Sequence, residues 1–311
     1  MTPPELPPNS ASPQHLLKDA DLSVAEQGEI LKLAAHMKAD RHKYQPLRNA
    51  SVALIFNKQS TRTRVSFQIG VTELGGNPIV IDTQTTQLSR GETLGDTGAV
   101  MSRYVDAMVM RTGDDSDLVE LASRSTVPVI NALTDHWHPC QLLADLQTMI
   151  ENGFSLPETT MAFVGDTSHN MGRSYVAIAA MHGAHLRLGS PPGYQPDASL
   201  IAKAQAAGAT ITVTDDPVEA VSGADVVTTD TWTSMSQSDG TNRQADLQRY
   251  QLNSDLLHHA DPEAIVLHCL PAHRGEEITD TVLDGPQSRV IDQAENRLHA
   301  QKALLTWLIG D

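Results

Sequence analysis

Residues 52–71 decide the fold: Val-Ala-Leu-Ile-Phe (52–56) is followed by Ser-Thr-Arg-Thr-Arg (60–64) and then by Val-Ser-Phe-Gln-Ile-Gly-Val (65–71). The first run is short and continuously apolar, which predicts a buried strand, and the last has helix-like spacing. The first N–H groups of a helix lack partners within it and lie at its positive end, where they bind anions. Three hydroxyls and two arginines add donors at that turn. The stretch therefore predicts a phosphate-binding site rather than only a capped helix with solvent-facing arginines.

The composition bounds the class of protein. The chain has 311 residues, enough for two domains of ordinary size, and 40% hydrophobic with 4% aromatic content predicts a largely aliphatic core. A net charge of −16 argues against nucleic acid as a partner, because phosphate backbones favour basic surfaces. An anionic substrate would then need clustered arginines, and those in motif-like stretches are Arg62, Arg64, Arg111, Arg274 and Arg297.

Two further features indicate the compartment. No apolar run is long enough to span a membrane, and the proline-rich N-terminus lacks the apolar core of a signal peptide. The two cysteines, Cys140 and Cys269, do not make a disulfide framework. We expect a cytoplasmic protein with reduced thiols and no membrane partner.

Apolar runs alternate with helical patterns along the chain, which is typical of parallel sheets with crossover helices. In the first half we expect a helix over 14–39, strands at 52–56, 77–82, 105–110 and 127–132, and helices at 96–104, 115–123 and 139–152. In the second half we expect strands at 160–164, 185–188, 210–213, 226–229 and 264–267, and helices at 171–183, 198–207, 218–221 and 294–308.

This alternation predicts an α/β fold with two similar-sized domains, each a parallel sheet flanked by helices. One domain is expected over 1–150, joined by a C-terminal helix (293–311) that packs back on it, and the other over 151–292. The helix at 139–152 is the expected hinge. A site is expected between the domains at the carboxyl ends of the strands, where open α/β sheets bind ligands.

Polar clusters follow the strands of the first half. Arg111 ends the third strand, next to the predicted anion site. In His-Trp-His-Pro-Cys-Gln (136–141), two histidines and a cysteine suggest a metal site, but no second cluster stands at ligand spacing. Pro139 fits the first turn of a helix, so His138 and Gln141 would project near its start. Both are suitable donors to a carbonyl oxygen that gains negative charge, and we expect neither metal nor organic cofactor.

Polar clusters also follow the strands of the second half. Gly-Asp-Thr-Ser-His-Asn-Met (165–171) lacks the G-x-G-x-x-G pattern, which argues against a dehydrogenase. Asn170 either caps a helix or binds the carboxylate or amine of an amino acid. Asp230 either caps a helix or binds a cationic amine. Cys269 could act as a thiolate nucleophile beside a histidine, but we expect a substrate contact.

Four motifs occur in one order along the chain: Ser-Thr-Arg-Thr-Arg (60–64), His-Pro-x-Gln (138–141), Asp-x-x-x-Ser-Met (230–235) and His-Cys-Leu-Pro (268–271). In this combination the sequence resembles the aspartate/ornithine carbamoyltransferase family. The resemblance covers Asp19 to Trp307 and implies transfer of the carbamoyl group of carbamoyl phosphate to an amine. It also implies a homo-oligomer, a trimer with sites at subunit interfaces.

The resemblance implies the site residues. Carbamoyl phosphate would be bound by Ser60, Thr61, Arg62, Thr63, Gln87, Arg111, His138, Gln141 and Arg297. Within that set Thr63, Arg111 and His138 would stabilise the carbonyl oxygen during catalysis. Ornithine would be bound by Asn170, Asp230, Ser234, Met235, Cys269 and Leu270.

Two positions depart from the family pattern, and the choice of acceptor is open. His169 stands where the family often has asparagine, and Ser236 where it often has glycine.

Aspartate, putrescine or an acylated ornithine are alternative acceptors, but Asp230 with the Ser-Met that follows favours ornithine and its conversion to citrulline. An inactive paralogue that serves as a binding or assembly subunit is the alternative outside enzymes. Arginine biosynthesis is the expected setting, although breakdown would use the same site.

Overall fold

The computed structural model describes residues 13–83, 91–232 and 243–310. The chain forms two compact units, unit 1 (Met1–Gln147 with Glu295–Asp311) and unit 2 (Thr148–Ala294). Within the described ranges, no helix combines the length and apolar character needed to cross a membrane.

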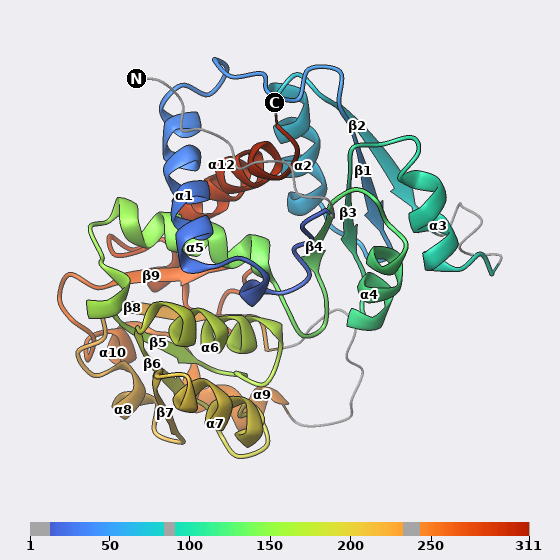
Figure 1. Ribbon diagram of the computed structural model, residues 1–311. Coiled ribbons are helices and arrows are strands. Elements are labelled where there is room, and N and C mark those ends of the chain that lie inside the picture. The colour runs from blue at the N-terminus through green and yellow to red at the C-terminus, as the bar shows by residue number, and fades with distance from the viewer. Residues whose placement is uncertain (1–12, 84–90, 233–242, 311) are drawn as a thin grey trace. The chain divides into compact units, whose positions relative to one another are not determined.

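Unit 1 contains a parallel sheet with strand order β2-β1-β3-β4 (Figure 1). Its strands are β1 (Ser51–Phe56), β2 (Asn77–Asp82), β3 (Ala107–Arg111) and β4 (Val129–Leu133). Its helices are α1 (Val24–Ala39), α2 (Arg62–Glu73), α3 (Leu94–Met101) and α4 (Asp115–Ser123), together with most of α5 (Pro139–Glu151) and of α12 (Val290–Ile309).

Strand β1 is the centre of the unit 1 core because both of its faces are covered. Val52, Leu54 and Phe56 belong to one buried cluster, and Ala53 and Ile55 belong to a second cluster on the opposite face. Side chains alternate between the faces of a strand, so a continuously apolar strand is buried on both sides. The prediction of a buried strand at 52–56 is confirmed.

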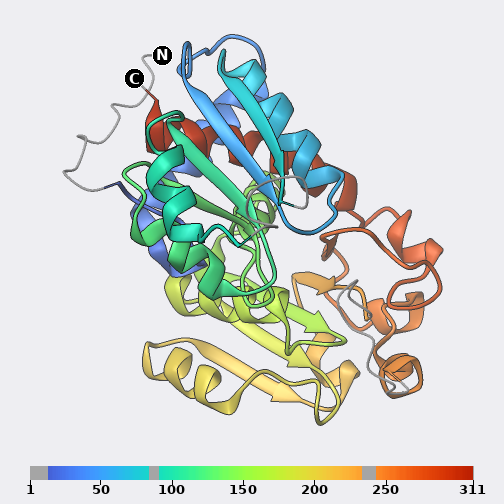
Figure 2. The ribbon, with the colours of Figure 1, turned by 90° about the vertical axis from the view of Figure 1, so that its right-hand side faces the viewer.

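Helix α12 returns to the sheet of unit 1. Its buried residues Ala303, Leu304 and Trp307 share a cluster with Phe67 of α2 and Ile30 of α1. Figure 1 and Figure 2 both show this last helix beside α1 and α2. The prediction that the C-terminal helix packs on the first half of the chain is confirmed.

The predicted helix over 14–39 is wrong in its first part. The α-helix begins only at Val24, where the Ser23 hydroxyl accepts a hydrogen bond from the N–H of Glu26 and the Glu26 carboxylate accepts from the N–H of Ser23. This capping box fixes the start of the helix. Before it, Leu16 pairs with Ile130 of β4 in a parallel bridge. Leu16 is therefore buried as an added sheet contact, which helical periodicity does not reveal.

Unit 2 contains a second parallel sheet with strand order β7-β6-β5-β8-β9. Its strands are β5 (Thr160–Val164), β6 (His185–Gly189), β7 (Thr210–Thr214), β8 (Val226–Thr229) and β9 (Ile265–His268). Its helices are α6 (Asn170–His182), α7 (Ala198–Ala206), α8 (Pro217–Val221), α9 (Arg243–Leu247), α10 (Ser254–Leu257) and α11 (Asp280–Leu283). The prediction of an α/β fold with two parallel sheets flanked by helices is confirmed.

Strand order locates the natural binding position on each sheet. In unit 1 the chain leaves β1 toward β2 on one side and reaches β3 on the other, and in unit 2 the same reversal occurs between β5 and β8. Ligands of open α/β sheets bind at such switch points, beyond the carboxyl ends of the strands. The residues after β1, β3, β5 and β8 are therefore the first place to look for chemistry.

Candidate active site

The switch point of unit 1 places two arginines on one hydroxyl. The buried Thr63, in the first turn of α2, accepts hydrogen bonds from Arg297 Nη2 at 2.8 Å and from Arg111 Nη1 at 3.4 Å. Arg111 Nη1 also lies 3.4 Å from Ser60 Oγ. The register between β3 and β4 shifts between Met110 and Arg111, a type of irregularity that redirects side chains near sites. Two guanidinium groups that converge on one hydroxyl make this place attractive to an anion.

Arg297 reaches this cluster from α12 and is held there although it is buried. Its Nη1 donates to Gln141 Oε1 at 2.9 Å, and Gln141 Nε2 in turn donates to Asp145 Oδ1 at 2.8 Å. A buried cation is tolerated only when hydrogen bonds replace its lost hydration. The structure thus joins Arg297 to Gln141 and Thr63, which lie 156 and 234 residues before it in the chain.

His138 precedes the first residue of α5 and is buried. Burial lowers its pKa well below the usual range, and the nearby charges of Arg297 and Arg111 lower it further. The imidazole is therefore neutral near pH 7. A neutral imidazole still carries one N–H donor.

The rest of the predicted anion site lies at the N-terminus of α2. Helix α2 begins at Arg62, and its N-cap residue Thr61 makes no side-chain capping hydrogen bond. Arg62 and Thr61 are exposed, and Ser60 is half-buried. Arg64 instead stacks its guanidinium over the Phe56 ring at 4.9 Å, which is a packing role. Gln87 lies outside the described residues.

The switch point of unit 2 joins Asp230 to Cys269. Asp230 directly follows β8, and its Oδ1 accepts a hydrogen bond from the Cys269 thiol at 3.1 Å and from the Thr231 N–H at 2.7 Å. Both Asp230 and Cys269 are half-buried. The thiol therefore acts as a donor to a carboxylate here, as expected of a contact residue rather than a nucleophile. Ser234 and Met235 lie outside the described residues.

Leu270 and its neighbours are fixed by a buried pair that the sequence did not point to. The Leu270 N–H donates to His268 Nδ1 at 2.9 Å, and His268 Nε2 lies 3.0 Å from Glu277 Oε1, with both side chains fully buried. Because Nδ1 is the acceptor, Nε2 carries the proton and donates to the carboxylate. Glu277 also accepts from the His273 N–H at 2.6 Å. This glutamate orients the loop that carries Cys269 and Leu270.

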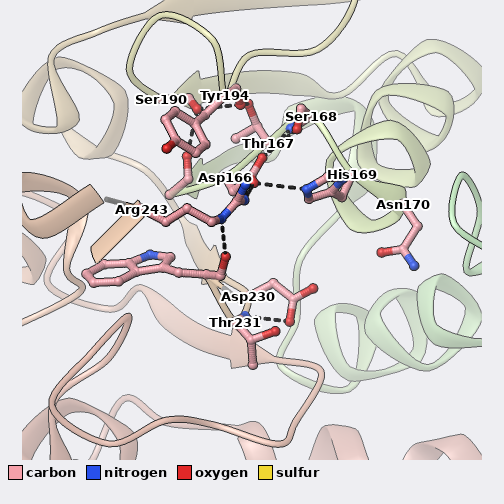
Figure 3. Close-up of polar contacts among 12 residues, drawn as sticks. Asp166, Thr167, Ser168, His169, Asn170, Ser190, Tyr194, Asp230, Thr231 and Arg243 are labelled. Atoms are coloured by element: carbon pink, nitrogen blue, oxygen red, sulfur yellow. Dashed lines mark hydrogen bonds and ion pairs between the residues drawn. The ribbon is translucent and has the colours of Figure 1, made fainter. Parts of the chain in front are cut away.

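A second charged group stands at the other side of the same switch point. Asp166 follows β5 after Gly165, whose φ of +114° suits glycine, and an added Cβ there would lie 3.2 Å from the Trp232 indole nitrogen. Asp166 Oδ2 contacts His169 Nε2 at 3.1 Å and the guanidinium of Arg243 (Figure 3). The Arg243 Nε donates to the Trp232 carbonyl at 2.8 Å. Sequence reasoning missed Asp166 and Arg243.

Asn170 is the first residue of α6, next to this group. Its Oδ1 accepts a hydrogen bond from the N–H of Met171 at 2.8 Å, so the asparagine does interact with its own helix. In the view of Figure 3 its side chain extends toward the same space as that of Asp230. That Asn170 and Asp230 bind one ligand stays a prediction.

Metal-ligating side chains gather in two places within the described ranges. One group is Asp230, His268 and Cys269, and the other is His273, Glu276 and Glu277; in each group the ligand atoms lie within 4.8 Å of one another. The first lies at the switch point of unit 2 already described. The 136–141 cluster, which the sequence offered as a possible metal site, does not gather into such a group in the described part of the chain.

Comparison with known proteins gives a consistent result for both halves. Residues 14–151 match the family model "Aspartate/ornithine carbamoyltransferase, carbamoyl-P binding domain", and residues 157–308 match the "Asp/Orn binding domain" model of the same family. A relative from Mycolicibacterium paratuberculosis, named ornithine carbamoyltransferase, is 53% identical over 304 residues, or 96% of this chain and 98% of its own length.

Solved structures agree with the sequence relatives. The ornithine carbamoyltransferase of Pyrococcus furiosus superposes with a TM-score of 0.91 at 42% identity, covering 97% of this chain and 98% of that one. The anabolic ornithine carbamoyltransferase of Campylobacter jejuni superposes with a TM-score of 0.89 at 35% identity, covering 95% and 98%. With both family models matched and nearly the whole length aligned, this chain belongs to the aspartate/ornithine carbamoyltransferase family.

Proposed function

We propose that the protein is an ornithine carbamoyltransferase, which transfers the carbamoyl group of carbamoyl phosphate to the δ-amine of L-ornithine and releases L-citrulline and phosphate. The observation that carries this proposal is the pair of arginines, Arg111 and Arg297, on the Thr63 hydroxyl at the switch point of unit 1. That arrangement suits a doubly charged phosphate. The names and high coverage of the relatives support the same reaction.

Each unit binds one substrate in this proposal. The first domain (1–150, with the C-terminal helix 293–311) binds carbamoyl phosphate through Ser60, Thr61, Arg62, Thr63, Gln87, Arg111, His138, Gln141 and Arg297. The second (151–292) binds ornithine through Asn170, Asp230, Ser234, Met235, Cys269 and Leu270. The half-buried carboxylate of Asp230 suits the ammonium group of ornithine, and the thiol of Cys269 holds that carboxylate in place.

The chemistry is an acyl transfer that these residues assist by position and charge. The neutral δ-amine attacks the carbonyl carbon, a C–N bond forms, and negative charge develops on the carbonyl oxygen. The tetrahedral intermediate collapses when the C–O bond to phosphate breaks, and the proton lost from the amine leaves with the phosphate. Arg111, Thr63 and the neutral His138 donate to the carbonyl oxygen, and the arginines stabilise the departing phosphate.

The neutral state of His138 suits that role. A protonated imidazole between two arginines would add a third buried cation, and burial together with Arg297 and Arg111 lowers the pKa of His138 to prevent this. The neutral ring is a fixed dipole whose N–H can meet the developing oxyanion without a change of protonation. Transition-state stabilisation here therefore comes from groups whose charge does not change around neutral pH.

The decisive test is a panel of acceptors. Purified protein is incubated with carbamoyl phosphate and, separately, with L-ornithine, putrescine, N-acetylornithine or L-aspartate, and both ureido product and phosphate are measured. We expect stoichiometric citrulline and phosphate with ornithine only. Turnover with another acceptor alone would keep the phosphate-binding residues and overturn the assignment of Asp230. Silence in all four reactions would favour an inactive paralogue that serves as a binding or assembly subunit.

We place this activity in arginine biosynthesis in the cytoplasm, carried out by a homotrimer whose sites lie at subunit interfaces. Both cysteines are free thiols, as suits a reducing compartment. A strain that lacks this protein should require arginine for growth, and added citrulline should satisfy that requirement. Sedimentation equilibrium should give three times the mass of the chain, 33.6 kDa.

A further inference from the structure

The acceptor end of the site contains an ionic group that the family motifs do not account for. Asp166, His169 and Arg243 meet at one carboxylate oxygen: His169 Nε2 lies 3.1 Å from Asp166 Oδ2, and the guanidinium of Arg243 contacts the same oxygen. They come from two places in the fold, the loop between β5 and α6, which carries Asp166 and the N-cap residue His169, and the start of α9. We call this group the acceptor triad (Figure 3).

The geometry of the triad is rigid at its centre. The Asp166 side chain is only 2% exposed, and its Oδ1 accepts hydrogen bonds from the Ser168 N–H at 3.0 Å and the Ser168 hydroxyl at 2.6 Å. Arg243 is tied to the Trp232 carbonyl and packs its guanidinium over the Tyr194 ring at 4.9 Å. The His169 side chain is 40% exposed. Ligands can therefore reach the histidine, while the carboxylate beneath it is fully occupied.

The charge of His169 is set by its surroundings. The hydrogen bond to Asp166 raises the pKa of His169, burial lowers it, and the charge of Asp166 raises it again. The other charged groups that face it are Arg243, which lowers the pKa, and Asp230, which raises it, and the net shift is upward. Burial alone would raise the pKa of Asp166, but the hydrogen bonds and charge of His169 and the bonds from Ser168 outweigh it, so this carboxyl stays ionised.

A count of charges shows what the triad can bind. One carboxylate and two cations leave one net positive charge while His169 is protonated, and none once it is neutral. Asp230, at the other side of the switch point, supplies one negative charge. An α-amino acid carries one carboxylate and one ammonium group, so its two charges are matched only while His169 is charged.

We propose that His169, as an imidazolium held by Asp166, binds the α-carboxylate of the amino-acid acceptor and selects acceptors that carry this group. When Nε2 donates to Asp166, the second proton of the imidazolium is on Nδ1, which supplies the N–H for the ligand carboxylate. Asn170 at the start of α6 adds a polar neighbour and the positive end of the helix. The inference rests on the proposed function and adds a charge-based selectivity at a position where the family often has asparagine.

The test uses two ligands that differ only in the group to be recognised. L-norvaline has the carboxylate and amine of ornithine but no δ-amine, so it binds without reacting, and L-norvalinamide carries a neutral amide instead of the carboxylate. Dissociation constants of both are measured by calorimetry with saturating carbamoyl phosphate, for the wild type and for His169→Asn. The exposed His258→Asn is the control for loss of a histidine elsewhere in unit 2.

The expected result is a difference between the two ligands. At pH 6, His169→Asn should raise the dissociation constant of L-norvaline about tenfold, as expected for loss of one charge-assisted hydrogen bond. The dissociation constant of L-norvalinamide should stay nearly unchanged. In the wild type, L-norvaline binding should weaken between pH 6 and pH 8 as the imidazolium loses its proton, and in His169→Asn this pH dependence should disappear. Equal losses for both ligands would overturn the proposal and leave His169 a merely structural residue.

Two controls keep this inference separate from the proposed function. If the wild type makes no citrulline in the acceptor panel, the proposed function fails, whatever His169 does. If citrulline is made but wild-type L-norvaline binding does not change with pH, the inference fails alone. The pH series of L-norvaline binding by the wild type needs no variant. It therefore tests the inference even if His169→Asn folds poorly. His169→Gln, which keeps a polar side chain, should behave as His169→Asn does.

Discussion

The two switch points of the molecule occupy the same topological position but differ in charge: one is positive and the other is mixed. Beyond β1 and β3, Arg111 and Arg297 converge on Thr63, and the charges there are guanidinium groups that do not titrate. Beyond β5 and β8, Asp230 and the acceptor triad contain both signs of charge. A parallel sheet thus supplies a place for a ligand, and the side chains after each strand decide which ligand it takes.

The same contrast is visible in two histidines. His138 is buried beside arginines, and burial with those charges lowers its pKa. His169 is half-exposed beside a carboxylate, and the hydrogen bond that it donates to Asp166 raises its pKa. One ring is kept neutral, and the other keeps its proton to a higher pH than a free imidazole does. The phosphate end should therefore work independently of pH around neutrality, whereas acceptor binding should depend on pH.

The largest expected effect comes from removing a fixed charge at the phosphate end. Arg111→Ala should lower kcat by about 10²–10³-fold, because the developing oxyanion and the phosphate lose a positioned donor. Steady-state assays at saturating ornithine measure it, with thermal unfolding to show that the fold survives. Arg48→Ala, an exposed arginine of the same unit, is the control. Near-normal turnover of Arg111→Ala would remove this residue from the mechanism.

A smaller effect is expected at the acceptor end, and in a different parameter. Asp230→Asn keeps the shape and the hydrogen bond from Cys269 but removes the charge that pairs with the ammonium group of ornithine. The KM for ornithine should rise about 10- to 100-fold, the usual range for a hydrogen bond to a charged group. The dissociation constant of carbamoyl phosphate should not change. A loss of carbamoyl phosphate binding would contradict the division of labour between the two switch points.

A variant of Cys269 tests whether this residue contacts the substrate or acts as a nucleophile. Because its thiol donates to Asp230, Cys269→Ser keeps a donor, and kcat/KM should fall less than about tenfold. A covalent mechanism would lose several orders of magnitude in the same variant. Mass spectrometry of protein quenched during turnover should find no carbamoylated cysteine. Cys140→Ser is the comparison, since burial raises the pKa of the Cys140 thiol to about 12 and leaves it unreactive.

How much of the fold and the site the sequence could predict depends on how far apart in sequence the interacting residues lie. Strand 52–56 and the hydroxyls after it are local, so a short continuous apolar run and a strand-to-helix turn suffice to predict them. The Leu16–Ile130 bridge joins residues far apart in sequence and leaves no periodic trace, which is why the start of α1 was predicted too early. Arg297 was assigned only through the family resemblance, because helical periodicity does not say which distant cluster its guanidinium reaches.

The acceptor triad shows the same limit at the site. Asp166 follows a buried strand, a position that could have drawn attention, and His169 was noticed only as a departure from the family pattern. Arg243 stands 77 residues from Asp166, and its pairing has no local signal. Fixed spacing identifies motifs, but an ionic group assembled from two distant segments becomes visible only when the fold brings it together.

The smallest expected effect is on the unfolding free energy. His138 and His169 should change its pH dependence in opposite directions. His138 is neutral when folded and binds a proton near pH 6.5 when unfolded, so its contribution to stability is full above that pH and is lost on acidification. The loss should be at most about 1.4 kcal/mol for each pH unit below about 6.5. His169, with its raised pKa, acts in the opposite direction: its contribution is full below pH 6.5 and is lost as the pH rises through its folded pKa.

Urea unfolding between pH 7.5 and 5.5 measures the difference. His138→Gln should flatten the fall of the unfolding free energy on acidification, because no proton is then taken up at this position on unfolding. His169→Gln should instead steepen that fall, since a group that stabilises the acid form is removed. His15, His182 and His299 also have pKa values lowered by burial and keep a residual slope in both variants. Slopes that change in the same direction in the two variants would contradict the assignment of a lowered pKa to His138 and a raised pKa to His169.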